Sequence, residues 1–236
     1  MAWLRRKVSP RYGAIGGIGK AIAVWLVLAA PVQAQEPVQA QEVVIAALGD
    51  SLTAGYGLPR GQGLVPQLQD WLDGRGHDVR LINAGVSGDT TAGGLARVDW
   101  TLGDDVDGMI VALGGNDLLR GIDPGVSRAN LDGILSAADA AGVEVLVIGM
   151  RAFNNFGEEY QAAYDAMYPE LAEAHGALFH EDFLGAISGM DTSGQEGFLP
   201  RYIQADGLHP NAAGVARIVE DIGPAVEALI QRAGQP

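Results

Sequence analysis

The chain has 236 residues, a formal net charge of −14 at pH 7 and no cysteine. This acidic balance argues against nucleic acid and anionic membranes as main partners, because both attract basic surfaces. Without cysteine there are no disulfides and no thiolate metal sites, and the chain is long enough for one domain with a buried core.

The N-terminal segment 1–34 has the order of a secretory signal peptide. Five basic residues lie within its first twenty positions, an apolar stretch follows at 21–30, and a small residue ends it at Ala34. The apolar stretch is shorter than the about 20 residues that a membrane span needs. We therefore expect export to the periplasm or out of the cell, with no stable membrane anchor after cleavage.

A short repeat follows the apolar stretch. The run Pro-Val-Gln-Ala-Gln-Glu occurs at 31–36 and again at 37–42, so cleavage could follow Ala34 or Ala40. We interpret the remainder, 35–42, as a processing linker in front of the folded domain.

Beyond this linker, apolar runs alternate with segments of helical periodicity. The apolar runs predict five strands, at 43–48, 79–82, 109–113, 143–148 and 177–179. The periodic segments predict helices at 62–74, 90–102, 123–142, 158–173 and 210–230, the last of them interrupted or kinked near Pro224. Such alternation indicates βαβ crossovers and a parallel sheet, and therefore an α/β fold.

Polar residues and glycines follow several of these strands. Ser51 follows the first strand, Gly85 the second and Asn116 the third. In open parallel sheets ligands bind outside the carboxyl ends of the strands, so we expect these residues to meet along one edge. Far downstream, Asp206 and His209 lie three positions apart.

These residue types fit the chemistry of acyl transfer. A serine hydroxyl is a weak nucleophile and needs an adjacent base, for which His209 is the candidate. A carboxylate at Asp206 would hold the imidazole in the required tautomer and stabilise the imidazolium. Glycine lets a backbone donor approach an oxyanion, and a fixed asparagine amide needs no reorganisation. The sequence therefore predicts a serine hydrolase with Ser51 as its nucleophile.

Each motif taken alone has a simpler explanation. Asp206 could cap a turn, and His209 could be a surface histidine. Gly85 could serve only a tight turn, and Asn116 could only cap a loop. Their common place at predicted strand ends, in this order along the chain, favours the catalytic interpretation.

Six motifs in combination point to a known family. They are Gly-Asp-Ser-Leu-Thr-Ala-Gly-Tyr at 49–56, Ser-Gly-Asp-Thr at 87–90, Gly-Leu-Ala-Arg at 94–97, Leu-Gly-Gly-Asn-Asp-Leu-Leu-Arg-Gly at 113–121, Tyr-Pro-Glu-Leu-Ala at 168–172 and Asp-Gly-Leu-His-Pro-Asn at 206–211. With them the chain resembles the SGNH (GDSL) hydrolases, specifically the bacterial periplasmic group of thioesterase I, arylesterase and lysophospholipase. The resemblance covers roughly residues 43–226.

The resemblance implies a hydrolase domain over 43–236 with a three-layer α/β/α sandwich, a parallel five-stranded sheet and a flavodoxin-like topology. It implies Ser51 as nucleophile, His209 as base and Asp206 as the residue that orients the base. The backbone N–H groups of Ser51 and Gly85, with the Asn116 side chain, would form the oxyanion hole. It also implies no cofactor and no metal, and small-molecule acyl ester, thioester or lysophospholipid substrates. A monomer is expected.

The acyl group of the substrate is expected to lie against apolar residues in two loops, namely Leu118, Leu119, Ile122, Phe153 and Phe156. Any one of them could instead pack in the core. The segments 152–157 and 188–204 depart from the family's pattern, so the preferred acyl length and head group stay open, as does the choice between ester and thioester.

Three other functions remain open at this stage. A carbohydrate O-acetyl esterase on the same fold would use the same residues on acetylated sugars. A non-catalytic module would bind a lipid or an ester without turnover. A flavodoxin-like phosphate or cofactor binder shares only the architecture, and architecture does not establish function.

Overall fold

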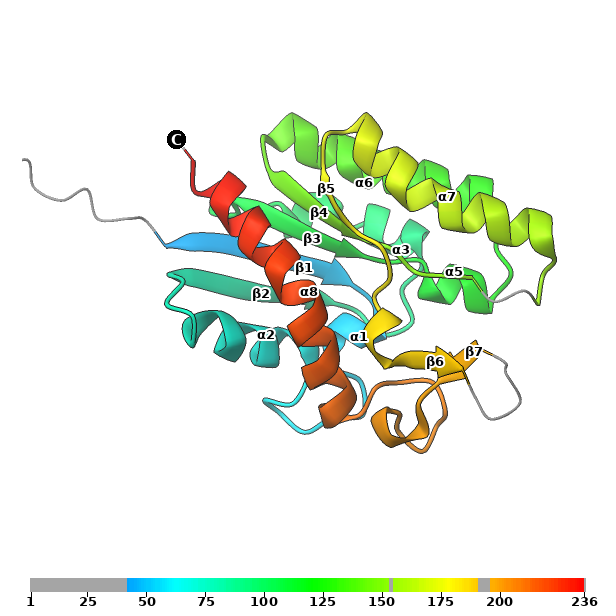
Figure 1. The fold of residues 1–236 in the computed structure, drawn as a ribbon. Coiled ribbons are helices and arrows are strands. Elements are labelled where there is room, and N and C mark those ends of the chain that lie inside the picture. Colours follow the sequence, from blue (N-terminus) through cyan, green and yellow to red (C-terminus); the bar gives the residue numbers. More distant parts are fainter. Residues whose placement is uncertain (1–41, 153–154, 191–195, 236) are drawn as a thin grey trace, which may run out of the picture. The chain divides into compact units, whose positions relative to one another are not determined.

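The computed structural model describes residues 42–152, 155–190 and 196–235 (Figure 1). The expected signal peptide, most of the expected linker and Phe153 lie outside these residues. The described residues belong to a single unit that spans 39–236.

A five-stranded parallel sheet lies at the centre of this unit. Its strand order is β2-β1-β3-β4-β5, so the chain reverses direction across the sheet after β2. The strands are β1 (Val43–Gly49), β2 (Val79–Gly85), β3 (Gly108–Ala112), β4 (Glu144–Ile148) and β5 (Leu178–His180). The five predicted strands and their parallel arrangement are confirmed.

The register aligns the carboxyl ends of the three strands that lead to the predicted site. Gly49 at the end of β1 pairs with Gly85 on one side and with Ala112 on the other. Residues that directly follow β1, β2 and β3 are therefore brought to one edge of the sheet.

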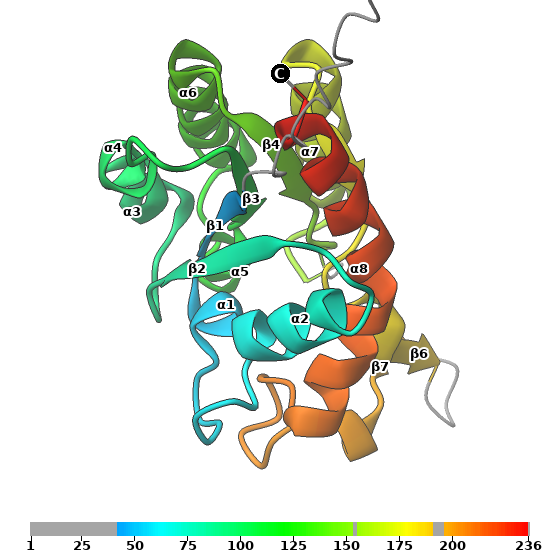
Figure 2. The same cartoon turned by 90° about the vertical axis from the view of Figure 1, so that its left-hand side faces the viewer.

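Helices cover both faces of the sheet, as expected for a three-layer sandwich (Figure 2). On one face, α8 crosses the strands and packs on α2; these helices are Ala212–Ala233 and Leu64–Asp73. The other face carries α3 (Thr91–Leu95), α4 (Val98–Thr101), α6 (Pro124–Ala141) and α7 (Glu158–Ala174).

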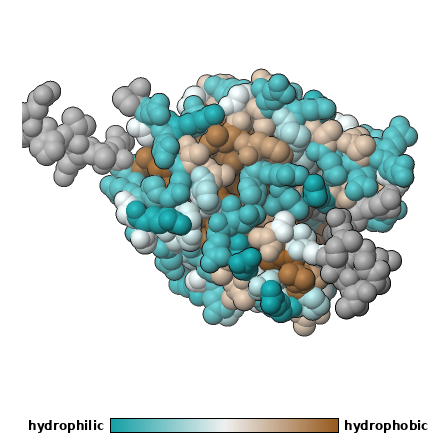
Figure 3. Space-filling view, in the orientation of Figure 1, coloured by the Kyte–Doolittle hydropathy of each residue, from teal (hydrophilic) through white to brown (hydrophobic). Residues whose placement is uncertain are grey.

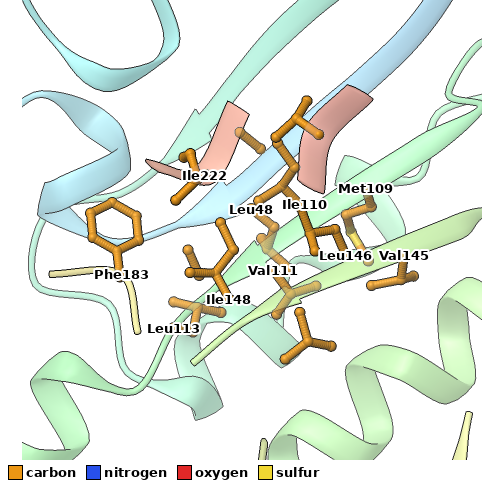
Figure 4. Close-up of a cluster of buried hydrophobic side chains, with 14 of the residues drawn as sticks. Leu48, Met109, Ile110, Val111, Leu113, Val145, Leu146, Ile148, Phe183 and Ile222 are labelled. Carbon is orange, nitrogen blue, oxygen red and sulfur yellow. The ribbon is translucent and has the colours of Figure 1, made fainter. Parts of the chain in front are cut away.

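The core is formed where these layers meet. β3 is buried along its whole length, and so is β1 from Val44 onward, because helices cover both of their faces. Figure 4 shows Leu48, Ile110 and Leu146 from three neighbouring strands, with Ile222 from α8 beside them. The continuous apolar runs that predicted the strands are the residues that fill this core.

The segment 90–102 forms two short helices instead of one. The break falls at Arg97, whose backbone leaves the helical region and whose guanidinium reaches back to the strand ends. The Arg97 side chain donates to Asp89 Oδ2 at 2.7 Å, to the Ala84 carbonyl at 2.7 Å and to the Gly49 carbonyl at 2.9 Å. Hydrogen bonding of the Arg97 guanidinium to carbonyls at the strand ends thus overrides the helical periodicity.

The last helix begins two residues later than predicted and is not broken at Pro224. Asn211 is its N-cap, and the Asn211 side chain accepts from the N–H groups of Ala213 and Gly214. Pro210 instead belongs to an isolated antiparallel bridge with Ile203.

Several short elements were not predicted, and most of them gather at the carboxyl edge of the sheet (Figure 1). They are α1 (Ser51–Ala54), α5 (Gly115–Leu119), η1 (Gly185–Ile187), β6 (Ser188–Met190), β7 (Glu196–Phe198) and η2 (Pro200–Tyr202). The strands β6 and β7 pair as an antiparallel ribbon beside the main sheet.

The outer surface is mostly polar. Hydrophilic residues cover most of the face in Figure 3, and hydrophobic residues gather in small areas between them. Within the part of the chain that the structure describes, no helix has the length and apolar character to cross a membrane.

Candidate active site

Ser51 is the first residue of α1, immediately beyond β1. The Asp50 side chain caps this helix by accepting from the Leu52 N–H at 3.0 Å. A β-carbon on Gly49 would lie 2.0 Å from Thr53 Oγ1, so glycine is needed where the strand turns directly into the helix. The Ser51 N–H, at the helix N-terminus, has no partner within the helix and is available to a ligand.

Ser51, His209 and Asp206 form a continuous hydrogen-bonded chain. His209 Nε2 lies 2.9 Å from Ser51 Oγ, and His209 Nδ1 lies 2.7 Å from Asp206 Oδ2. Asp206 Oδ1 accepts in addition from the backbone N–H groups of Leu208 and His209, each at 3.0 Å. The three side chains come from opposite ends of the sequence, and the fold brings them together.

The Asp206 carboxylate is held in its ionised form. Hydrogen bonds from the backbone N–H groups of Leu208 and His209, and then from the His209 ring, lower the pKa of Asp206 to about 2. An ionised Asp206 accepts from Nδ1–H. This leaves Nε2 as the acceptor for the Ser51 hydroxyl proton, which is the tautomer that a general base needs.

The loop that carries His209 is fixed by contacts that sequence reasoning did not identify. Gln204 Nε2 donates to the Tyr56 carbonyl at 2.8 Å and to the Pro210 carbonyl at 2.9 Å. The Tyr56 ring packs on the imidazole, with 4.6 Å between the ring centroids. Tyr56 ends the same motif run that contains Ser51, which was the only sequence signal for it.

Asn116 lies on α5, directly beyond β3, and faces the same site. Its Nδ2 donates to Asp50 Oδ2 at 3.2 Å. This bond links the Asn116 amide to the residue that precedes the nucleophile. Burial raises the pKa of Asp50, while hydrogen bonds from Leu52 N–H and Asn116 counteract this shift. Among the described residues the second amide hydrogen of Asn116 has no acceptor, so it is available to a ligand in the cavity.

A buried carboxylate anchors α5. Asp117 is fully buried and accepts from the Thr91 N–H at 2.9 Å, from Thr91 Oγ1 at 2.6 Å and from Ser127 Oγ at 2.9 Å. These bonds join α5 to α3 and α6. The position of the neighbouring Asn116 amide is therefore set by a rigid network and not by the loop alone.

The structure does not bring Gly85 to the site. Its N–H donates to Asn83 Oδ1 at 2.9 Å, and its Cα packs so tightly on α1 that a β-carbon would lie 2.3 Å from the Ala54 nitrogen. Gly88 occupies the expected place instead: it lines the cavity beside Ser51 with a φ of 88°. Within the described ranges no acceptor binds the Gly88 N–H, whereas its carbonyl accepts from Arg120 Nη2 at 2.9 Å.

A cavity of about 430 Å³ opens beside Ser51 and His209. Leu118 and Leu119 lie on its wall, as predicted for substrate contacts.

Ile122 and Phe156, also predicted to contact the acyl group, do not line this cavity. Gly121, with a φ of 61°, turns the chain after α5, and both residues contact Tyr160 of α7. The Ile122 carbonyl accepts from Tyr160 Oη at 2.8 Å, and the Phe156 ring packs on the Tyr160 ring at 5.0 Å.

The remaining apolar wall comes from residues that sequence reasoning missed. They follow β4 and β5 or belong to β7 and the His209 loop, and they are Met150, Leu184, Phe198 and Leu208. Met150 could have been found from its place after the fourth strand. Phe198 lies in a segment without periodicity, and nothing in the sequence indicated it.

The other histidines contact carboxylates and do not line this cavity. His77 contacts Glu227, His175 contacts Asp132 and Asp139, and His180 contacts Asp221. In residues 42–152, 155–190 and 196–235 no group of three or more histidine or acidic side chains is placed to hold a metal ion.

Comparison with known proteins agrees with this geometry. The GDSL-like lipase/acylhydrolase family model matches residues 47–217. The chain belongs to this family. It is therefore a carboxylic ester hydrolase, and the family predicted from the motifs is confirmed.

Individual relatives match over most of their length. Esterase TesA of Pseudomonas aeruginosa is 36% identical over 187 residues, which cover 79% of this chain and 89% of that protein. Thioesterase 1/protease 1/lysophospholipase L1 of Escherichia coli K12 is 35% identical over 166 residues, 70% of this chain and 74% of the relative. AlinE4, an SGNH-hydrolase family esterase with a crystal structure, has 43% sequence identity to this chain. Its structure matches with a TM-score of 0.64 over 80% of this chain and 96% of that one.

Proposed function

We propose that this hydrolase cleaves acyl esters and thioesters through an acyl-serine intermediate formed on Ser51. The observation that carries the proposal is the hydrogen-bonded chain from Ser51 Oγ through the His209 ring to the Asp206 carboxylate, at 2.9 and 2.7 Å. Distances in this range allow proton transfer from the hydroxyl to the imidazole.

In the first half-reaction, Ser51 Oγ attacks the acyl carbonyl carbon while His209 Nε2 takes the hydroxyl proton. The tetrahedral intermediate collapses, the bond to the leaving oxygen or sulfur breaks, and His209 returns the proton to the leaving group. In the second, His209 takes a proton from water as the water attacks the acyl-serine. The carboxylic acid is released and the Ser51 hydroxyl is restored.

Three donors are assigned to the oxyanion that develops in both steps. They are the backbone N–H groups of Ser51 and Gly88 and the Asn116 Nδ2. Gly88 replaces the predicted Gly85, because the Gly85 N–H is already bound to Asn83 and the Gly88 N–H is not. The positive φ of Gly88 lets its peptide turn toward the cavity.

The substrates assigned to this site carry an acyl chain that lies along the apolar wall of the cavity. The names of the relatives include esterase, thioesterase and lysophospholipase. Acyl esters, acyl thioesters and lysophospholipids all present the same acyl carbonyl, so one acyl-serine serves all three. A cavity of about 430 Å³ with leucine and methionine walls favours chains longer than acetyl over acetylated sugars.

The proposal includes export and action as a monomer. The signal-peptide pattern at 1–34, the linker at 35–42 and the hydrolase domain at 43–236 support a mature enzyme in the periplasm or outside the cell.

One kinetic series tests the function and the oxyanion assignment together. kcat/KM is measured on p-nitrophenyl esters from acetyl to palmitoyl, for the wild-type protein and for Asn116→Ala. We expect wild-type activity to peak at medium chain length, because the cavity is apolar and of limited size. We expect kcat of Asn116→Ala to fall on the order of 10²-fold at each length, because one fixed oxyanion donor is lost.

The other outcomes are equally informative. Activity confined to acetyl esters would favour the carbohydrate O-acetyl esterase, and binding without turnover would favour the non-catalytic module. An Asn116→Ala enzyme with wild-type kcat would remove this amide from the oxyanion hole. A circular dichroism melt of both proteins excludes misfolding as the cause of lost activity.

A further inference from the structure

An acidic side chain, Asp182, lies on the wall of the cavity beside Ser51, whose lining is mostly apolar. It follows β5, whereas Ser51 follows β1, and both line the same cavity. In the strand order β1-β3-β4-β5 the two strands are three spacings apart. Three spacings correspond to about 14 Å. Asp182 is therefore at the far end of the cavity from the nucleophile.

The carboxylate of Asp182 is incompletely satisfied. Its Oδ1 accepts from the Leu184 N–H at 3.1 Å, and no other donor in the described residues reaches the Asp182 side chain. Partial burial of this carboxylate raises the pKa of Asp182, because burial disfavours the charged form. The second carboxylate oxygen of this half-buried side chain has no donor among the described residues, so a ligand group in the cavity can supply one.

The charged neighbours of Asp182 are already engaged. Arg151 Nη2 donates to Glu181 Oε1 at 2.8 Å, and His180 forms an ion pair with Asp221 at 3.3 Å. The charges of Arg151 and His180 lower the pKa of Asp182 and so favour its ionised form, with Glu181 opposing them. A cationic ligand would also meet the positive Arg151 guanidinium, which lines the same cavity, so a neutral hydrogen-bond donor suits the position better.

Apolar side chains line the cavity between the nucleophile and Asp182, together with Arg151. Leu118 and Met150 follow the two intervening strands, and Leu184 lies beside Asp182 itself. An acyl chain whose carbonyl is at Ser51 can lie along these side chains, and its distal end then meets the carboxylate.

We propose that Asp182 forms a hydrogen-bonding subsite at the distal end of the acyl cavity, which selects acyl chains that carry a hydroxyl group near their end. This inference rests on the proposed function, because the acyl chain must be bound at Ser51. A chain with a terminal hydroxyl donates to Asp182. A plain chain of the same length covers the carboxylate with methylene groups and leaves it unpaired, and buried unpaired polar groups reject such analogues.

The test compares matched pairs of substrates. kcat/KM is measured on p-nitrophenyl octanoate, decanoate and dodecanoate and on their ω-hydroxy forms, for wild type and Asp182→Leu. At the length that reaches the subsite, we expect the hydroxy-to-plain ratio to fall about tenfold in Asp182→Leu. Asp221→Asn is the control, because it removes one negative charge near the same strand without altering the cavity wall; it should leave the ratio unchanged.

The inference and the proposed function fail in different ways. If wild type hydrolyses the plain esters but the ratio is the same in Asp182→Leu at every length, the subsite does not exist and the esterase activity stands. If wild type hydrolyses no ester, the proposed function fails first. Should Asp182→Leu not fold, Asp182→Ala removes the acceptor with a smaller side chain. A lowered ratio is again expected, and an unchanged ratio overturns the inference.

Discussion

His209→Ala is expected to lower kcat on a p-nitrophenyl ester by about 10⁴-fold or more. The imidazole is the only base within hydrogen-bond distance of Ser51 Oγ in the described residues, at 2.9 Å, so the variant must attack with a neutral hydroxyl. The oxyanion donors remain, and they account for the activity that is left. The measurement is steady-state kcat with saturating ester, on protein whose melting temperature is unchanged.

Asp206→Asn tests the second hydrogen bond of the same chain, between Asp206 and His209, and its kcat is compared with that of His209→Ala. It keeps the shape of the carboxylate but removes the charge that holds Nδ1–H, and we expect a loss of a similar order. If His209→Ala kept more than about a tenth of wild-type kcat, His209 would not be the base. If Asp206→Asn kept as much, Asp206 would not be the residue that orients the base.

Asp117→Ala is expected to lower the free energy of unfolding by about 3 kcal/mol or more, because three buried donors lose their acceptor. The donors are the Thr91 N–H, Thr91 Oγ1 and Ser127 Oγ, and all of them lie in the contact between α5, α3 and α6. Urea unfolding followed by circular dichroism measures the change. Because Asn116 is the next residue, kcat should fall as well.

Asp123→Ala is the matched control. Asp123 is also an aspartate that accepts from backbone, here as the N-cap of α6 through the Gly125 N–H at 2.8 Å, but it is exposed to solvent. Removing such a cap costs typically about 1 kcal/mol. If Asp117→Ala were no more destabilising than Asp123→Ala, the buried network would not be what fixes α5.

The fold could be read from the sequence because most of its strands are buried on both faces. A run such as 43–48 has no polar face, so its apolar residues stand out regardless of neighbours. The helix boundaries were less certain. The break at Arg97 depends on carbonyls at the ends of β1 and β2, which are distant in sequence and come near only in the folded chain.

The oxyanion donor shows how a small error in a strand end changes a functional assignment. The sequence predicts that the second strand stops at 82, which places Gly85 in the turn. In the structure β2 continues to Gly85, and the Asn83 side chain binds the Gly85 N–H. The turn therefore falls later, at 86–88, and Gly88 reaches the cavity. The β propensity of Asn83 and Gly85 is low, so no local signal predicted the extension.

The cavity wall was predicted only in part for a related reason. Leu118 and Leu119 follow a predicted strand closely enough for their position to be inferred. Phe198 and Leu208 reach the cavity through the β6–β7 ribbon and the His209 loop, whose conformations depend on contacts with distant segments such as Tyr56. Local sequence patterns carry no information about contacts of this kind.

Covalent trapping tests the central claim, that Ser51 is the nucleophile, most directly. The protein is treated with an alkyl fluorophosphonate, digested, and the modified peptide is sequenced by mass spectrometry. We predict one phosphonyl adduct, on Ser51, with loss of esterase activity in proportion to labelling and no adduct in Ser51→Ala. An adduct on Ser87 or Ser188, which also line the cavity, or full inactivation without modification of Ser51, would contradict the account.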